Sequence, residues 1–331
     1  MQRVTGQQRY ATEIAQRLAG LDGFDERRPH GFWAASAVRV WLWVLAVLPV
    51  TARSAVVLSM TARAPLWQRR HVLVVHDLFV LTNPEWFSHA YVWTHAPLLR
   101  AQLRSAAALV AVSQPVAELL ERYSPAVQVA PNAPSDVFLH SRRSEGSEES
   151  SDALAARALV PGQYFLTVGS TDPRKNLPRL ARAYAGLSES ERRAHPLVVI
   201  GGGSAVFRSQ DIAWPVGVVD AGYVSDDELR QLYRGSLAVV FASLAEGFGL
   251  PLVEAAGAGA SCLVISDIPV FRWVCGDEAH YVDPSSEDSI LAGMRAAAQT
   301  PARLDIDLGR FSWDASARVI REVCEGLATR R

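Results

Sequence analysis

Short apolar runs recur along the chain, separated by polar loops and by stretches with helical periodicity. They fall at 56–58, 72–75, 109–112, 127–129, 164–168, 197–200, 238–241 and 262–265. Most are rich in valine, isoleucine and leucine, which is typical of strands covered on both faces. The helical stretches include 226–234, whose first residues offer the Ser and Glu of a capping box. This alternation predicts an α/β protein with parallel sheets and right-handed crossovers.

One segment interrupts the alternation. Residues 141–152 read SRRSEGSEESSD and hold no apolar side chain that could offset the entropy of ordering. We therefore predict a Rossmann-like domain at 1–140, a linker at 141–157 and a second Rossmann-like domain at 158–331. Ligands bind such sheets at the carboxyl ends of the strands, so we expect the two domains to face one another across a cleft.

A further apolar stretch runs from 33 to 48 and ends near Pro49. Its uninterrupted apolar part is about half of what is needed to cross a bilayer. Read as a helix, it places one set of apolar side chains on a single face: Trp33, Ala37, Trp41, Val44, Leu45 and Leu48. We expect this face to pack on a sheet. An alternative is a peripheral contact with lipid headgroups, helped by nearby arginines.

Charge and cysteine content exclude several classes of protein. Of the 331 residues, 49% are hydrophobic and 20% charged, and the net charge is −1. This balance gives no field for general nucleic-acid binding. The three cysteines are far apart and the N-terminus lacks a signal peptide's apolar core, which predicts a cytoplasmic protein. His76 and Asp77, together with His71, His89 and His95, form no HxxxH or DxD arrangement, and no GxSxG spacing occurs, so neither a metal nor another cofactor is predicted.

The strongest candidate site is EGFGLPLVE at 246–254, between an apolar run and a helical pattern. Pro251 suits a first helical turn, and the glycines let backbone amides approach a ligand. Amides at a helix N-terminus attract phosphate. We place Glu254 in the first turn, where its carboxylate could accept two hydroxyl hydrogen bonds. The alternative is a glycine-rich loop with a capping glutamate.

Other candidates also follow predicted strands. Arg174–Asn176 comes soon after Gly169, and its two cations suit a diphosphate that gains charge as a bond breaks. His76 follows another strand, and Gly6 opens an amphipathic helix. Each of these has an ordinary structural explanation by itself. Together they suit the diphosphate, ribose and hexose of one ligand.

These residues resemble a known family, glycosyltransferase family 4, with the glycosyltransferase-B fold. The resemblance covers nearly the whole chain. It rests mainly on VGSTDPRKN (168–176), AGYVSDDELRQLY (221–233), EGFGLPLVEA (246–255) and ISDIPVF (265–271), and less specifically on VTGQQRYA (4–11), VVHDLFVLTNPEWFS (74–88) and VAVSQPVAELL (110–120). The family implies metal-independent transfer of a sugar with retention of configuration.

The resemblance also implies roles at matching positions. Arg174 and Lys175 would hold the donor diphosphate and stabilise the leaving group, and Glu254 would bind the ribose hydroxyls. The remaining roles are as follows: Glu246 with the backbone of Phe248, Gly249 and Leu250 for the transferred sugar, His76 at the reacting sugar, Gly6 near the phosphate or acceptor, Gly169 at the donor, and the backbone around Tyr223 and Val224 at the nucleobase.

The nature of the substrates follows from the same resemblance. Chains of this kind resemble mannosyl- and rhamnosyltransferases of surface polysaccharide assembly. GDP-mannose is therefore the favoured donor, with UDP- and dTDP-sugars open. The expected acceptor is a glycan or a lipid-linked glycan.

The chain departs from the family pattern in a few places. Only Met1–Arg3 precede the VTG stretch where the family has a first strand, so either the first sheet lacks a strand or the start is displaced. Trp273 stands where the family often has a glutamate. These departures leave open a catalytically weak scaffold or partner subunit. A nucleotide-sugar epimerase is a lesser alternative, and it would need further acidic residues.

Overall fold

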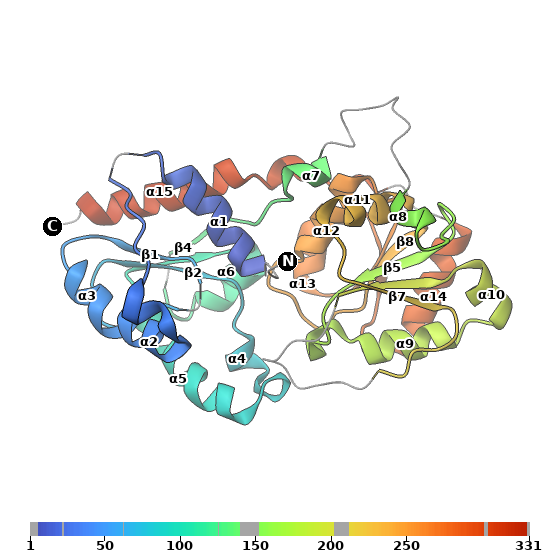
Figure 1. Ribbon diagram of the computed structural model, residues 1–331, viewed down its shortest axis with the longest axis horizontal. Coiled ribbons are helices and arrows are strands. Elements are labelled where there is room, and N and C mark those ends of the chain that lie inside the picture. Colours follow the sequence, from blue (N-terminus) through green and yellow to red (C-terminus); the bar gives the residue numbers. More distant parts are fainter. Residues whose placement is uncertain are drawn as a thin grey trace. The chain divides into compact units, whose positions relative to one another are not determined.

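A computed structural model describes residues 6–21, 23–61, 63–124, 126–139, 152–201, 212–300 and 304–329. The chain divides into two compact units (Figure 1). Unit 1 comprises 1–84, 89–132 and 311–331, and unit 2 comprises 85–88 and 133–310. Each unit holds one parallel sheet, as the alternation of apolar runs and helices predicted.

The sheet of unit 1 has the order β1-β2-β3-β4 among the described residues, with every pair parallel. The strands are β1 (Val57–Ser59), β2 (His71–Val75), β3 (Ala108–Ala111) and β4 (Val127–Val129). The central strand β2 is buried at all five positions, as expected for a strand with helices on both faces. All four strands were predicted from their apolar runs.

Helices α5 and α6 cover one face of this sheet. Leu103 of α5 and Leu120 of α6 pack in one core with Leu73 and Leu109 of the strands. The helices and short helical turns of this part of the chain are α1 (Gly6–Leu18), η1 (Gly31–Ala35), α2 (Ala37–Leu42), η2 (Trp43–Val47), α3 (Leu48–Thr51), α4 (Phe79–Thr82), η3 (Pro84–Trp86), α5 (His89–Ser105) and α6 (Gln114–Leu120).

The apolar stretch 33–48 forms η1, α2, η2 and α3, with η2 a single π-helical turn. Only Val44 and Leu48 of the predicted inner face are fully buried, and Trp41 is half-buried against His95 of α5. No helix in the described part of the chain is long and apolar enough to cross a membrane.

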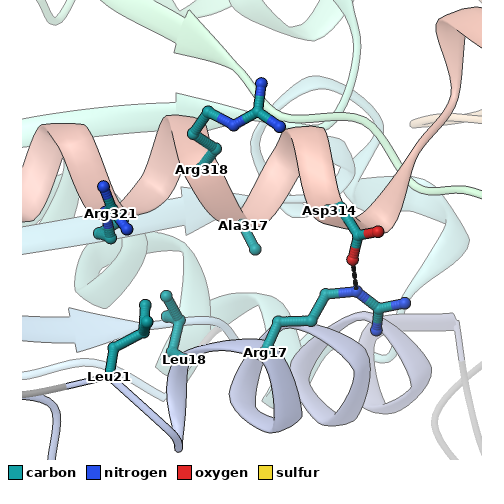
Figure 2. Close-up of a pocket in the computed structure, with 7 residues that line it drawn as sticks. All are labelled: Arg17, Leu18, Leu21, Asp314, Ala317, Arg318 and Arg321. Atoms are coloured by element: carbon teal, nitrogen blue, oxygen red, sulfur yellow. Dashed lines mark hydrogen bonds and ion pairs between the residues drawn. The ribbon is translucent and has the colours of Figure 1, made fainter.

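Helix α15 (Trp313–Thr329) also belongs to unit 1, where it lies along α1 (Figure 1). Arg17 of α1 joins Asp314 of α15 through a 2.6 Å ion pair. This pair lies at one side of a pocket of about 280 Å³ (Figure 2). Buried hydrogen bonds join both helices to the chain after β4: Tyr10 donates to the carbonyl of Ala130, and Ser316 to that of Pro131. The predicted second domain ended at 331, whereas the structure groups residues 311–331 with unit 1.

The sheet of unit 2 has the order β10-β9-β8-β5-β6-β7, again parallel throughout. Its strands are β5 (Phe165–Val168), β6 (Leu197–Ile200), β7 (Val218–Gly222), β8 (Ala238–Phe241), β9 (Leu263–Ser266) and β10 (His280–Val282). The two edge strands, β7 and β10, were not predicted. Nearly all of their positions are partly or fully exposed, and polar residues interrupt their apolar ones.

Helices cover both faces of this sheet. On one face α9 and α14 pack together against β8 and β9, and on the other α7, α11 and α12 pack together. The helices and turns of unit 2 are α7 (Asp136–Leu139), α8 (Asp152–Ala155), η5 (Pro173–Lys175), α9 (Leu177–Ala185), α10 (Glu189–Ala194), α11 (Asp226–Gly235), α12 (Leu250–Ala258), α13 (Pro269–Cys275), α14 (Glu287–Gln299) and η6 (Leu308–Arg310). The predicted capping box of α11 is present, with Ser225 and Glu228 as reciprocal partners.

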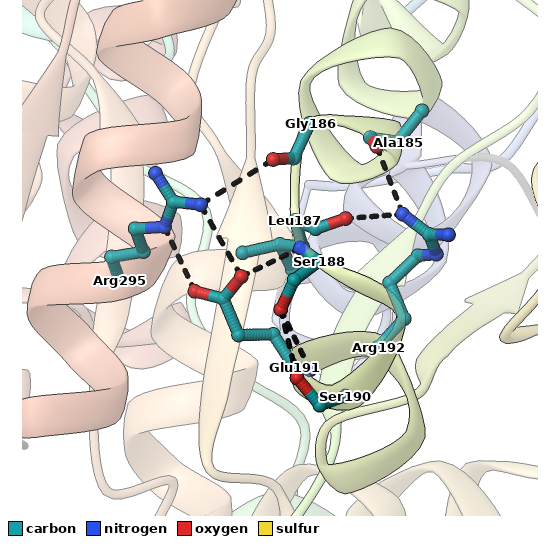
Figure 3. A network of polar contacts seen from close by, with 8 residues as sticks. All are labelled: Ala185, Gly186, Leu187, Ser188, Ser190, Glu191, Arg192 and Arg295. Atoms are coloured by element: carbon teal, nitrogen blue, oxygen red, sulfur yellow. Dashed lines mark hydrogen bonds and ion pairs between the residues drawn. The ribbon is translucent and has the colours of Figure 1, made fainter.

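A polar network fixes α10 against α14 (Figure 3). Glu191 accepts from the amide of Ser188 in a second capping box, and both its oxygens accept from Arg295 of α14. Hydrogen bonds from Arg295 and Ser188 lower the pKa of Glu191 to about 2. Much of the predicted linker, residues 141–151, lies outside the described residues.

Candidate functional site

The predicted donor residues of unit 2 gather where the central strands of its sheet end. The loop 169–176 follows β5, and the loop 242–249 follows the neighbouring β8. A backbone hydrogen bond joins the two loops, with the amide of Leu244 donating to the carbonyl of Arg174 over 2.7 Å. Two motifs 71 positions apart in sequence therefore form one surface at the carboxyl edge.

Arg174 is held in place by Asp172. The side chain of Asp172 is 1% exposed, and it caps η5 by accepting from the amide of Arg174. The Nε and Nη2 atoms of the Arg174 guanidinium also donate to Asp172. The guanidinium is thus oriented before any ligand binds, which reduces the entropy lost on binding.

Lys175 forms an ion pair with Glu246 of the loop after β8. Lys175 Nζ lies 2.7 Å from Glu246 Oε1, which also accepts from the hydroxyl of Ser243 at 2.9 Å. Burial alone would raise the pKa of Glu246. The charges of Lys175 and Arg174 and these two hydrogen bonds outweigh burial and hold the pKa below its usual value. Glu246 is therefore ionised at neutral pH.

Asn176 completes the connection between loops. Its backbone has φ 56° and ψ 29°, a left-handed conformation that asparagine tolerates better than most residues. The buried side-chain amide donates to the carbonyls of Ala242 and Pro284. These bonds tie the end of η5 to the loops after β8 and β10, so Arg174 and Lys175 sit on a rigid turn.

Helix α12 begins at the end of the loop 242–249. Gly249 is its N-cap with φ 86°, and a Cβ there would lie 3.0 Å from Phe271. Glycine is therefore required both by conformation and by the close approach of Phe271. Pro251 occupies the first turn, as predicted.

Glu254 differs from its predicted position. It is the fifth residue of α12, beyond the first turn, which contains no acidic residue. The difference arises because the helix already begins at Leu250, so that its first turn ends at Val253. Glu254 is 6% exposed, so its carboxylate lies largely among protein atoms.

Two glycines lie side by side at the ends of β5 and β6. The amide of Gly169 donates to the carbonyl of Ile200. A Cβ on Gly201 would lie 1.9 Å from the carbonyl oxygen of Gly169, so no other residue fits at 201 without moving the loop. Gly202 and Gly203, which follow Gly201 in the sequence, lie outside the described residues.

Two further predicted positions lie at the edge of the sheet. Tyr223 and Val224 follow β7, where Tyr223 is 64% exposed.

Trp273 of α13 packs edge-on against Phe248, with ring centroids 6.0 Å apart, and the guanidinium of Arg310 lies over the indole ring of Trp273. The residue that departs from the family pattern thus supports the loop bearing Glu246.

His76 and Gly6 are in unit 1. His76 Nε2 lies 3.0 Å from the carbonyl of Met60, and its ring meets Tyr10 edge-on. Burial lowers the pKa of His76 in spite of the Met60 carbonyl and the charge of Asp77. A carbonyl only accepts, so Nε2 carries the proton and Nδ1 of the neutral ring is an acceptor. Gly6 is the first residue of α1 and a Cβ there would meet no neighbour.

Sequence reasoning overlooked Asp172 and Ser243 as parts of this arrangement. Asp172 carried a signal, since Asp-Pro two residues before an arginine favours a cap and turn. Ser243 carried none, because its contact with Glu246 depends on how the loop after β8 folds.

Among the described residues no group of three or more His, Cys, Asp or Glu side chains is placed to hold a metal ion.

The fold of this chain is that of the glycosyltransferase-B enzymes. A solved structure of WaaG, described as a glycosyltransferase involved in lipopolysaccharide biosynthesis, is similar with a TM-score of 0.67 over 99% of this chain and 96% of that one, at 16% identity. Residues 157–306 match the family of glycosyl transferases group 1. The chain therefore carries a glycosyl transferases group 1 domain at these residues, which include the loops 169–176 and 242–249 described above.

Two curated relatives are similar in sequence. The O-antigen chain mannosyltransferase B of Escherichia coli is 28% identical over 74% of this chain and 67% of its own length. The O-antigen chain mannosyltransferase RfbU of Salmonella typhimurium is 30% identical over 47% of this chain and 45% of its own length. The chain thus spans between about half and two thirds of these relatives.

Proposed function

We propose that this chain is a retaining, metal-independent glycosyltransferase that moves a hexosyl group, mannose in preference, from a nucleotide-sugar to a glycan or lipid-linked acceptor. The observation that carries the proposal is the pair of oriented cations, Arg174 and Lys175, beside the N-terminus of α12. The group 1 domain and the mannosyltransferase relatives support it.

The two cations suit a departing diphosphate. As the bond from the anomeric carbon to the diphosphate breaks, the electron pair goes to the phosphate oxygen and negative charge develops there. Arg174, held by Asp172, and Lys175, held by Glu246, supply positive charge without first having to reorganise. The acceptor hydroxyl oxygen forms the new bond on the same face of the sugar, and its proton leaves with the diphosphate.

Glu246 then has two tasks. It fixes Lys175 in the free protein, and its second carboxylate oxygen accepts hydroxyl hydrogen bonds from the transferred sugar, with the backbone of Phe248, Gly249 and Leu250 alongside. Its lowered pKa keeps it an acceptor at neutral pH. Since Glu246 is ionised beside the reacting sugar, it also stabilises positive charge on the ring in the transition state.

The remaining donor contacts are assigned as the family resemblance implies. Glu254 accepts from the ribose hydroxyls, the backbone around Tyr223 and Val224 meets the base, and Gly169 allows close approach of the donor. In unit 1, His76 presents its neutral ring to the reacting sugar, and Gly6 approaches the phosphate or acceptor.

The names of the relatives favour GDP-mannose as the donor, with UDP- and dTDP-sugars as the next candidates. A glycan or lipid-linked acceptor follows from the same comparison with O-antigen enzymes.

A titration of the purified protein with GDP, UDP, dTDP and their sugars in EDTA tests this proposal. We expect one nucleotide to bind, detected by calorimetry and by a rise in the unfolding temperature that grows with ligand concentration. Lys175→Met should lower the rate of donor turnover by about a hundredfold, with a much smaller effect on nucleotide affinity. Glu254→Gln should instead weaken nucleotide binding.

Arg182→Met is the matched control, because Arg182 lies on the adjoining helix α9 and is paired with Glu287 in an exposed ion pair. It should change neither binding nor turnover. Equal losses of affinity and turnover in Lys175→Met would reduce Lys175 to a ground-state binding role. Failure of every nucleotide to bind would favour the scaffold alternative.

A further inference from the structure

The outer face of the helical segment 37–51 is apolar although it points into solvent. Val38, Leu42, Ala46 and Val50 recur every four residues, which places them on one side of the helix. Val38 is 69% exposed, Leu42 52% and Val50 74%, whereas Val44 and Leu48 on the inner side are below 9%. A surface helix ordinarily carries polar residues on this side.

We name Val38, Leu42, Ala46 and Val50 the outer stripe. Other exposed apolar side chains lie near the outer stripe along the sequence. Six of the ten large apolar side chains that are most exposed in the described residues lie between 32 and 93, including Phe32, Trp67 and Trp93. Helix α2 lies against α5, which bears Trp93, through the contact of Trp41 with His95 (Figure 1).

The charge of this region is strongly one-sided. Arg27 and Arg28 are paired with Asp25 and Glu26, but residues 29–76 contain five further arginines and no aspartate, glutamate or lysine. Over 29–117 there are seven arginines and two acids, a formal charge of +5 in a chain whose total is −1. Arg39 and Arg53 stand at the two ends of the outer stripe, and the guanidinium of Arg39 lies over the ring of Phe32.

We propose that the outer stripe is a docking surface for an anionic lipid bilayer, with the segment 37–51 lying in the plane of the headgroups. Apolar side chains flanked by arginines and aromatic rings fit the boundary between headgroups and acyl chains. The segment is about 22 Å long, too short to span the hydrocarbon core. A second copy of the chain fits less well, because a twofold contact would set this basic region against itself.

This surface belongs to unit 1, and its binding to lipid needs neither donor nor acceptor. Co-sedimentation of the full chain with vesicles therefore tests it separately from the proposed transferase activity. Vesicles of equal parts phosphatidylglycerol and phosphatidylcholine should bind the protein, and vesicles of phosphatidylcholine alone should bind it weakly. Raising the salt from 50 to 500 mM should weaken binding by screening the arginines.

The triple variant Val38→Ser/Leu42→Ser/Val50→Ser should lose at least about tenfold in vesicle affinity, because it removes the apolar contacts. The matched control is Val160→Ser/Val216→Ser, which changes two exposed valines of unit 2 and should bind as the parent does. Arg39→Gln/Arg53→Gln should reduce the preference for phosphatidylglycerol.

Two results would overturn the proposal: unchanged binding in the triple variant, or no binding of the parent to anionic vesicles. A self-association of the parent that the triple variant abolishes, without vesicle binding, would assign the face to a contact between copies. If the triple variant fails to fold, hydrogen exchange of the parent protein tests lipid docking instead. Residues 37–51 should gain protection with phosphatidylglycerol vesicles, and no gain there would equally refute lipid docking.

Discussion

His71 and Glu246 show how burial has opposite outcomes for two ionisable side chains. Both are removed from water, but two cations and two hydrogen bonds keep Glu246 charged. His71, on the central strand β2, lies 3.0 Å from the hydroxyl of Ser59 and is 0% exposed. Burial lowers the pKa of His71 to about 4, so it stays neutral in the fold.

The protein should therefore lose stability in mild acid through His71. The unfolded chain takes up a proton near pH 6.5 and the folded chain only near pH 4, so the contribution is complete above pH 6.5 and is lost between these values. The loss should reach about 3 kcal/mol. In His71→Gln, urea unfolding should depend less on pH over this range, while the surface variant His89→Gln keeps the parent slope. An unchanged slope in His71→Gln would contradict this assignment.

At the scale of elements, helices and central strands follow their sequence signals closely. The capping box of α11 and the eight apolar runs predicted real elements, because both signals depend on neighbours within a few residues. The edge strands β7 and β10 were missed because an edge strand is half-solvated and needs no apolar run. Glu254 was expected in the first turn of α12 but lies just past it, because the helix begins at Leu250 and a left-handed glycine N-cap leaves no distinct mark in the sequence.

The N-terminus of α12 should depend on Gly249. In Gly249→Ala the Cβ meets Phe271 at 3.0 Å on a backbone with φ 86°, so we expect a loss of roughly 2–4 kcal/mol in unfolding free energy. Gly162→Ala is the control, since Gly162 has φ 73° and no neighbour within 4 Å, and should cost roughly 1 kcal/mol. Equal losses in the two variants would show that Phe271 gives way.

At the scale of the whole molecule, the sequence did not predict the unit against which the last helix packs. Its amphipathic pattern identifies a helix but not the sheet on which it packs. Helix α15 joins unit 1 because Arg17, Tyr10 and the chain after β4 meet it. A pattern of apolar positions says that a face is buried, and the identity of the covering element follows only from packing.

Substitutions at two buried isoleucines should destabilise different units. Ile320 of α15 and Ile290 of α14 are both 0% exposed, and truncating either to alanine should cost roughly 2–5 kcal/mol. Hydrogen exchange should locate the damage: Ile320→Ala should lower protection in α1 and β4, and Ile290→Ala in β8 and β9. Loss of protection in β8 and β9 on changing Ile320 would instead assign α15 to the second domain, as the sequence suggested.

The sequence by itself determined the α/β class and the central strands, and it singled out Arg174, Lys175 and Glu246 as candidates, because apolar runs and paired charges at strand ends are local signals. It did not determine which partners hold those residues. Asp172 orients Arg174 and Ser243 joins the Lys175–Glu246 pair only once β5 and β8 are neighbours. The exposure of the outer stripe was likewise decided by tertiary structure, since a helix that is apolar on both sides does not reveal in sequence which side the sheet will cover.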